Sequence, residues 1–158
     1  MFIPYGKQNI NQADIDSVID VLKSDWLTQG PSVEIFEEAA RLKHGASFGC
    51  AMNSATSALH IACLALGVGK GDWLWTSPNT FAASSNCGLY CGARIDFVDI
   101  DSNTFNMCPQ KLELKLEEAS IKGTLPKVVV PVHFGGLSCD MVAINKLSIK
   151  YGFKIIED

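Results

Sequence analysis

Small hydroxyl side chains gather at a predicted helix start, where they could hold an anion. The stretch Asn53-Ser54-Ala55-Thr56-Ser57-Ala58 leads into a helix expected over 55–66. The first turn of a helix offers unpaired backbone N–H groups and the positive end of the helix dipole, which together favour a phosphate group. Ordinary capping by a serine or threonine is the alternative. The sequence lacks the glycine fingerprint of a dinucleotide site and the lysine of a phosphate loop, which argues against both.

Other candidate side chains follow predicted strands at their carboxyl ends, where ligands bind in open α/β sheets. Phe81 comes after a strand expected over 73–76. Its ring could stack on a flat ligand, or it could be a core side chain. Glu157 and Asp158 end the chain after the last expected strand. A carboxylate there could bind a protonated ring nitrogen, cap a helix or remain at the surface.

A histidine followed by two glycines marks a third strand end. His133 comes directly after a strand expected over 128–132, and Gly135 and Gly136 follow closely. Glycines in this position indicate a tight turn with close backbone approach. The imidazole could act as an acid, a base or an orienting donor, or it could be a purely structural side chain.

Taken together, these positions describe a particular kind of ligand. A phosphate cradle, a stacking ring and a carboxylate at successive strand ends suit a phosphorylated aromatic ring that carries a basic nitrogen. Pyridoxal phosphate has this chemistry.

The elements that must position these residues alternate along the chain. Two helices lead, the first over 11–24 with Asn11 and Asp14 as a capping box, the second over 32–44. The expected strands then lie near 46–52, 73–76, 94–98, 128–132 and 153–156, and the helices over 55–66, about 80–90, from Pro109 and from Met141. Alternation of this kind predicts an α/β fold with a mainly parallel sheet and helices on both faces. The helix from Pro109 should bury Leu112, Leu116 and Ala119.

Composition excludes several classes of protein. The chain has 158 residues, of which 47% are hydrophobic and 19% charged, with a net charge of −4. It is too apolar for disorder, and its acidity argues against nucleic acid and anionic membrane surfaces as partners. No apolar run is long enough for a membrane span.

The six cysteines are expected to be free, mostly buried thiols. Cys87 and Cys91 are spaced for one helix face, but no further ligand completes a metal site, so no metal is predicted. Reduced thiols and the lack of an export signal predict a cytoplasmic protein. The chain stops directly after a strand, so a fragment of a longer protein is expected, with a natural small domain as the alternative.

Long motifs give the chain a family resemblance. It resembles the DegT/StrS-type nucleotide-sugar aminotransferases, which depend on pyridoxal 5'-phosphate and have the fold-type I, aspartate-aminotransferase-like architecture, and especially those that serve pseudaminic acid biosynthesis. The matching stretches are I-P-Y-G-K-Q at 3–8, S-D-W-L-T-Q-G-P at 24–31, N-S-A-T-S-A-L-H at 53–60, T-S-P-N-T-F-A-A-S at 76–84, F-V-D-I-D at 97–101, P-V-H-F-G-G at 131–136 and I-I-E-D at 155–158.

The resemblance implies a role for each matched cofactor position. The family's phosphate loop falls on Ala55, Thr56 and Ser57, and its ring-stacking aromatic residue falls on Phe81. The family's aspartate, which hydrogen-bonds the pyridinium nitrogen, falls on Asp158. Holding a proton on that nitrogen keeps the ring an electron sink during amino transfer.

Contacts with the sugar nucleotide are implied for a second group of residues near the start of the chain. They are Tyr5, Asp25, Trp26, Leu27 and Thr28. Residues 1–45 would form the N-terminal helices of an incomplete large domain and 46–158 its alternating, cofactor-binding part, with the C-terminal part absent.

The resemblance also implies an activity for the full-length parent. An amino group would pass from L-glutamate to C4 of a UDP-4-keto-6-deoxy-N-acetylhexosamine, in a homodimer. The family's Schiff-base lysine lies downstream of the aspartate, so the chain alone should be inactive and holds no catalytic residue of its own. The alternatives are a sugar dehydratase of the same fold and a non-catalytic truncated binding module.

Overall fold

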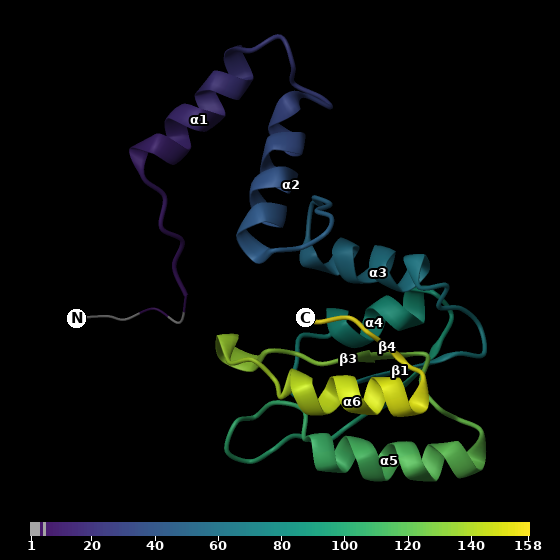
Figure 1. The fold of residues 1–158 in the computed structure, drawn as a ribbon. Helices are drawn as coiled ribbons and strands as arrows, with labels where there is room; N and C mark the ends of the chain where they lie inside the picture. The colour runs from purple at the N-terminus through teal and green to yellow at the C-terminus, as the bar shows by residue number, and fades with distance from the viewer. Residues whose placement is uncertain (1–3, 5) are drawn as a thin grey trace. The chain divides into compact units, whose positions relative to one another are not determined.

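The computed structural model describes residue 4 and residues 6–158. The chain divides into two compact units, Met1–Ala51 and Met52–Asp158, and each is described by itself. Figure 1 shows the helices and strands of both.

The first unit consists of two amphipathic helices, α1 (Gln12–Lys23) and α2 (Pro31–His44). Asn11 caps α1, and its side chain accepts hydrogen bonds from the Ala13 and Asp14 amides. The Asp14 carboxylate in turn accepts from the Asn11 amide, so the predicted capping box is confirmed. Neither helix buries a residue.

The strand expected near 46–52 is wrong, because this segment pairs with no strand of the described chain. It packs against α2 instead. The Ala51 amide donates to the Glu37 carboxylate at 2.7 Å. A Cβ on Gly49 would come within 2.6 Å of the Glu37 carbonyl oxygen, so only glycine allows this approach. A strand exists only where a neighbour completes its hydrogen-bond ladder.

The second unit alternates helices with strands, as predicted. Its elements are α3 (Ala55–Ala65), β1 (Trp73–Thr76), α4 (Ala83–Tyr90), β2 (Arg94–Phe97), α5 (Pro109–Lys122), β3 (Val128–Val130), the short 3-10 helix η1 (Phe134–Gly136), α6 (Met141–Tyr151) and β4 (Lys154–Ile155). The described strands form one sheet in the order β2-β1-β3-β4, and all neighbouring pairs are parallel. The order reverses between β1 and β3, which makes their carboxyl ends the switch point where ligands bind in such sheets.

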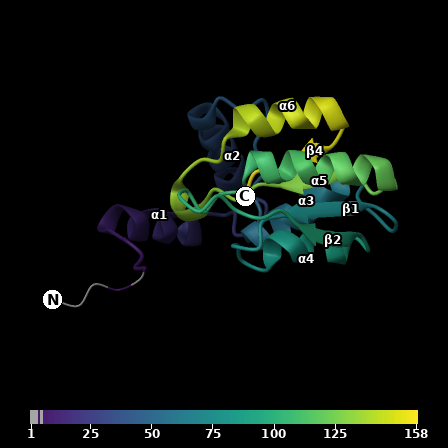
Figure 2. The ribbon, with the colours of Figure 1, turned by 90° about the horizontal axis from the view of Figure 1, so that it is seen from below.

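Helices cover both faces of the sheet, which confirms the predicted fold class. In Figure 1, α3 and α4 lie above the sheet, and α5 and α6 lie below it; Figure 2 shows α5 and α6 side by side. Successive side chains of a strand point to opposite faces of the sheet, so they pack into two separate hydrophobic cores, one on each face. Leu74 packs with the α3–α4 layer, and Trp75 with the α5–α6 layer. Leu112, Leu116 and Ala119 are the buried residues of α5, as predicted.

One ion pair connects the residues that directly precede β1 and β3, at the amino ends of these strands. The Asp72 carboxylate accepts from the Lys127 ammonium group at 2.9 Å and from the Gly69 amide at 2.9 Å. The hydrogen bond from Lys127 lowers the pKa of Asp72. Because both side chains are about one-third exposed, the pair should contribute at most about 1 kcal/mol.

The Asp72→Asn variant should therefore lose stability in a pH-dependent way. A carboxyl whose folded pKa is lowered stabilises the fold above its unfolded pKa of about 3.9, and that contribution disappears as the pH falls through the folded pKa. The free energy of unfolding, measured by denaturant titration between neutral pH and about pH 3, should show the two proteins converging in acid. A difference that stays constant over this range would contradict the interpretation.

Candidate functional site

The start of α3 is capped and still offers amides to a ligand. Ser54 caps the helix, since its hydroxyl accepts from the Ser57 amide at 3.2 Å and lies 3.1 Å from the Ser57 hydroxyl. The amides of Ala55 and Thr56 bond to none of the described residues. Capping by Ser54 is therefore confirmed, and free donors remain in the first turn, so the phosphate interpretation stays a prediction.

Phe81 is not a core side chain. Its ring is 80% exposed, in a connection between β1 and α4. An exposed aromatic ring at the carboxyl end of a strand is free to stack on a flat ligand, so the stacking interpretation stays open and the core interpretation is wrong. Helix α4 begins only at Ala83 rather than near residue 80.

Asp158 is fixed through both its backbone and its side chain. Its amide donates to the Pro131 carbonyl at 3.0 Å, and its carbonyl accepts from the His133 amide at 2.8 Å. The Ser84 hydroxyl donates to carboxylate atom Oδ2. No described residue bonds to Oδ1, which leaves one acceptor atom for a ligand. In Figure 1 the chain end at Asp158 lies at the same end of the second unit as the first turn of α3.

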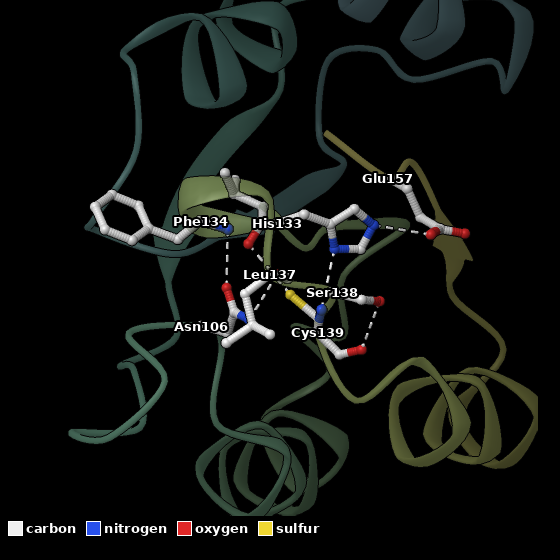
Figure 3. Close-up of polar contacts among 8 residues, drawn as sticks. Asn106, His133, Phe134, Leu137, Ser138, Cys139 and Glu157 are labelled. Carbon is white, nitrogen blue, oxygen red and sulfur yellow. Dashed lines mark hydrogen bonds and ion pairs between the residues drawn. The ribbon is translucent and has the colours of Figure 1, made fainter. Parts of the chain in front are cut away.

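His133 has both ring nitrogens engaged, as Figure 3 shows. Its Nδ1 accepts from the Cys139 amide at 3.1 Å, so the proton of the neutral ring must sit on Nε2. Nε2 lies 3.0 Å from a Glu157 carboxylate oxygen and donates to it. This arrangement supports the structural reading of His133: it connects the end of β3 to the residue before Asp158.

A buried asparagine holds the turn that follows β3. Asn106 is 3% exposed, and its side-chain oxygen accepts from the Phe134 amide at 2.9 Å. Its side-chain nitrogen donates to the Leu137 carbonyl at 2.9 Å (Figure 3). Gly135 and Gly136 adopt positive φ values of 62° and 83°, which confirms the predicted tight turn. Sequence reasoning missed Asn106, because its partners lie about 30 residues away.

Removing this side chain should be costly. In an Asn106→Ala variant the Phe134 amide and the Leu137 carbonyl lose their partners in a buried place, so the free energy of unfolding should fall by about 2 kcal/mol or more. Asn106→Asp keeps an acceptor for Phe134 but loses the donor to Leu137, so it tests the two bonds separately. Denaturant unfolding of the variants measures both effects. A loss below about 0.5 kcal/mol for the alanine variant would contradict this role.

The cysteines behave as core side chains in the second unit. Cys63, Cys87, Cys108 and Cys139 are buried, and all six cysteines are free. Hydrogen bonding to Cys87, together with burial, raises the pKa of Cys63, so this thiol is neutral. Among the described residues no three metal-ligating side chains come together. No helix in the part of the chain that the structure describes has the length and apolar character to cross a membrane.

One surface hollow of the second unit lies away from the predicted residues. It measures about 540 Å³ and lies beside α5, with Trp73 and Trp75 in its wall. Its lysines are matched by carboxylates, in the pairs Lys111–Asp99, Lys115–Asp96 and Lys122–Glu118. With its charges paired inside the protein, this hollow offers little to an anionic ligand.

The predicted substrate residues belong to the first unit. Tyr5 lies outside the described residues. Asp25, Trp26, Leu27 and Thr28 are all exposed and link α1 to α2. The Ser24 hydroxyl accepts from the Trp26 amide at 3.2 Å, which shapes the link. A Cβ on Gly30 would lie 2.8 Å from that of Trp26, so the turn needs glycine there.

Comparison with known proteins defines the class. The sequence profile of the DegT/DnrJ/EryC1/StrS aminotransferase family matches residues 8–158, and the chain belongs to this family. It is 43% identical, over 99% of its own length and 40% of the relative's, to the UDP-4-amino-4,6-dideoxy-N-acetyl-beta-L-altrosamine transaminase of Campylobacter jejuni serotype O:23/36. It is 42% identical to the spore coat polysaccharide biosynthesis protein SpsC of Bacillus subtilis, over 99% of the chain and 39% of SpsC.

Solved structures agree with the fold. The putative sugar aminotransferase Spr1654 of Streptococcus pneumoniae, in its PLP form, superposes with a TM-score of 0.88 at 30% identity. The match covers 99% of this chain and 42% of that one. The chain thus spans about two fifths of the length of the curated relatives it matches.

The donor set of the second unit fits pyridoxal phosphate. Free amides at the start of α3 suit a phosphate group. The exposed Phe81 ring suits a flat heterocycle, and the unbonded Oδ1 of Asp158 suits a protonated ring nitrogen. These three kinds of group match the phosphate, the flat ring and the ring nitrogen of this cofactor.

Proposed function

We propose that the protein carrying this chain transfers an amino group from L-glutamate to C4 of a UDP-4-keto-6-deoxy-N-acetylhexosamine. The observation that carries the proposal is Asp158, held at the switch-point edge of the sheet with one carboxylate oxygen unbonded, in a chain 43% identical to the Campylobacter transaminase. The product class follows from that relative's name. The spore coat relative supports a sugar substrate in general.

Pyridoxal phosphate, when bound, supplies an electron-withdrawing ring that stabilises negative charge on the carbon next to the transferred nitrogen. The chain's own residues hold and tune that ring. The amides of Ala55 and Thr56, with the Ser57 hydroxyl, bind the phosphate. Phe81 packs on the ring face and excludes water. Asp158 accepts a hydrogen bond from the ring nitrogen and so holds the proton on that nitrogen.

The substrate and the remaining machinery complete the proposal. Tyr5 and the exposed link Asp25–Thr28 contact the sugar nucleotide. The lysine that moves the proton is supplied by sequence outside these 158 residues, since the relatives are more than twice as long. Two subunits form a homodimer. The free thiols of the chain suit a reducing compartment such as the cytoplasm.

Transfer of labelled nitrogen tests this proposal. The full-length protein, supplied with pyridoxal phosphate, is incubated with the 4-keto sugar nucleotide and L-glutamate that carries heavy nitrogen. Mass spectrometry should find the heavy nitrogen on the sugar. The 158-residue chain alone should give no labelled product. Loss of water from the sugar without nitrogen transfer would instead establish a dehydratase, and an intact substrate would overturn the proposed chemistry.

A further inference from the structure

A buried serine of α4 contacts Asp158, the residue proposed to bind the ring nitrogen. Ser84 is 0% exposed, and its hydroxyl donates to Oδ2 of Asp158, 74 residues further along the chain. Because an ionised carboxylate can only accept, the serine must be the donor in this contact. Ser84 has no place in the functional assignments made from the sequence.

A second hydroxyl group, that of Thr80, donates a hydrogen bond to the Ser84 hydroxyl. The Thr80 hydroxyl lies 2.7 Å from that of Ser84. With the Ser84 proton committed to the carboxylate, Thr80 donates its own proton to the Ser84 oxygen. The result is a chain of two hydrogen bonds, in which Thr80 donates to Ser84 and Ser84 donates to the Asp158 carboxylate. Neighbouring hydrogen bonds of this kind strengthen one another.

The rest of Asp158 is held by its backbone. Its amide and carbonyl bond to Pro131 and His133, so rotation of the carboxylate is the freedom that remains. The contact from Ser84 to Oδ2 removes that freedom and leaves Oδ1 without a bond from any described residue. The orientation of the atom that would meet a ligand therefore depends on a side chain that never touches the ligand.

We propose that Ser84 is a positioning residue that orients the Asp158 carboxylate toward the ring nitrogen of pyridoxal phosphate, with Thr80 supporting it. This inference rests on the proposed function, because it takes Asp158 as the partner of that nitrogen.

Two cofactors that differ at one atom test it. In 1-deazapyridoxal 5'-phosphate a carbon replaces the ring nitrogen, so its binding does not depend on the Asp158 contact. Dissociation constants for both compounds are measured on the full-length apoprotein. Ser84→Ala should bind pyridoxal phosphate about tenfold more weakly, since the Asp158 carboxylate is then no longer held toward the ring nitrogen. It should bind the deaza compound as the natural protein does.

Matched variants separate the possible outcomes. Ser85→Ala, next along α4, removes a hydroxyl that bonds, among the described residues, only to the Ala82 carbonyl, and it should change neither constant. Thr80→Val, at a residue that is not buried, should reproduce the selective loss at about two- to threefold even if Ser84→Ala fails to fold. Equal weakening for both compounds would show a merely structural role and overturn the proposal.

The parent proposal is checked by Asp158→Asn in the same assay. If this variant weakens pyridoxal phosphate selectively while both hydroxyl variants bind normally, the role of Ser84 is overturned and that of Asp158 stands. If Asp158→Asn also leaves pyridoxal phosphate binding unchanged, the assignment of Asp158 fails, and the inference about Ser84 fails with it.

Discussion

Replacing Asp158 with alanine is expected to lower the turnover number for amino transfer by about a hundredfold or more, at saturating pyridoxal phosphate. Without this carboxylate, nothing on the proposed site holds the proton of the ring nitrogen, so negative charge on the reacting carbon is stabilised less well. Steady-state kinetics of the full-length protein, followed through the glutamate-dependent formation of the amino sugar, measures the effect.

A control carboxylate distinguishes this effect from a general loss of charge. Glu113 pairs with Lys150 between α5 and α6, and both side chains are about half exposed. Glu113→Gln should therefore retain turnover within about twofold, because an exposed pair of this kind contributes little. Circular dichroism of both variants should match that of the natural protein. Turnover of Asp158→Ala within about fivefold of normal would remove Asp158 from the proposed chemistry.

A large effect on stability is expected at Leu112. This side chain is fully buried in the core between the sheet and the α5–α6 layer. Leu112→Ala removes apolar atoms and leaves a cavity that tightly packed neighbours cannot close, so the free energy of unfolding should fall by about 3 kcal/mol, within the usual range of about 2–5. Guanidinium unfolding of the full-length protein measures the loss.

The same helix offers the control. Leu114 is two residues away on α5 and 62% exposed. Leu114→Ala should change the free energy of unfolding by no more than about 0.5 kcal/mol. If the two variants lost similar stability, the assignment of the buried face of α5 would be wrong, because one chemical change would then have the same effect in the core and at the surface.

Most of the second unit was predictable, because its signals are local. Helical spacing identified the three residues that α5 buries, and the β-branched run identified β3. That strand ends at Val130 rather than at 132, since Pro131 has no amide to continue the ladder. The strand predicted for 46–52 was wrong because the signal there is not local. An extended, partly apolar stretch does not reveal whether a neighbouring strand exists.

The candidate site was predictable at its strand ends and helix start but not in its supports. The positions of Phe81 and Asp158 follow from the rule that ligands bind at the carboxyl ends of strands. The exposure of the Phe81 ring, and the engagement of both nitrogens of His133, depend on packing that no spacing reveals. Ser84 was missed for the same reason, since its partner is distant in the chain.

The parallel order of the sheet also determines how the nascent chain must fold. Neighbouring parallel strands cannot be joined by a tight turn, so each pairing waits for a helical crossover. Thr76 of β1 bonds through its side chain to Val130 of β3, a separation of 54 residues. Such high contact order slows folding. During synthesis β1 therefore gains its β2 neighbour first and leaves its other edge unpaired until β3 has left the ribosome, and an unpaired strand edge of this kind exposes the chain to misassociation.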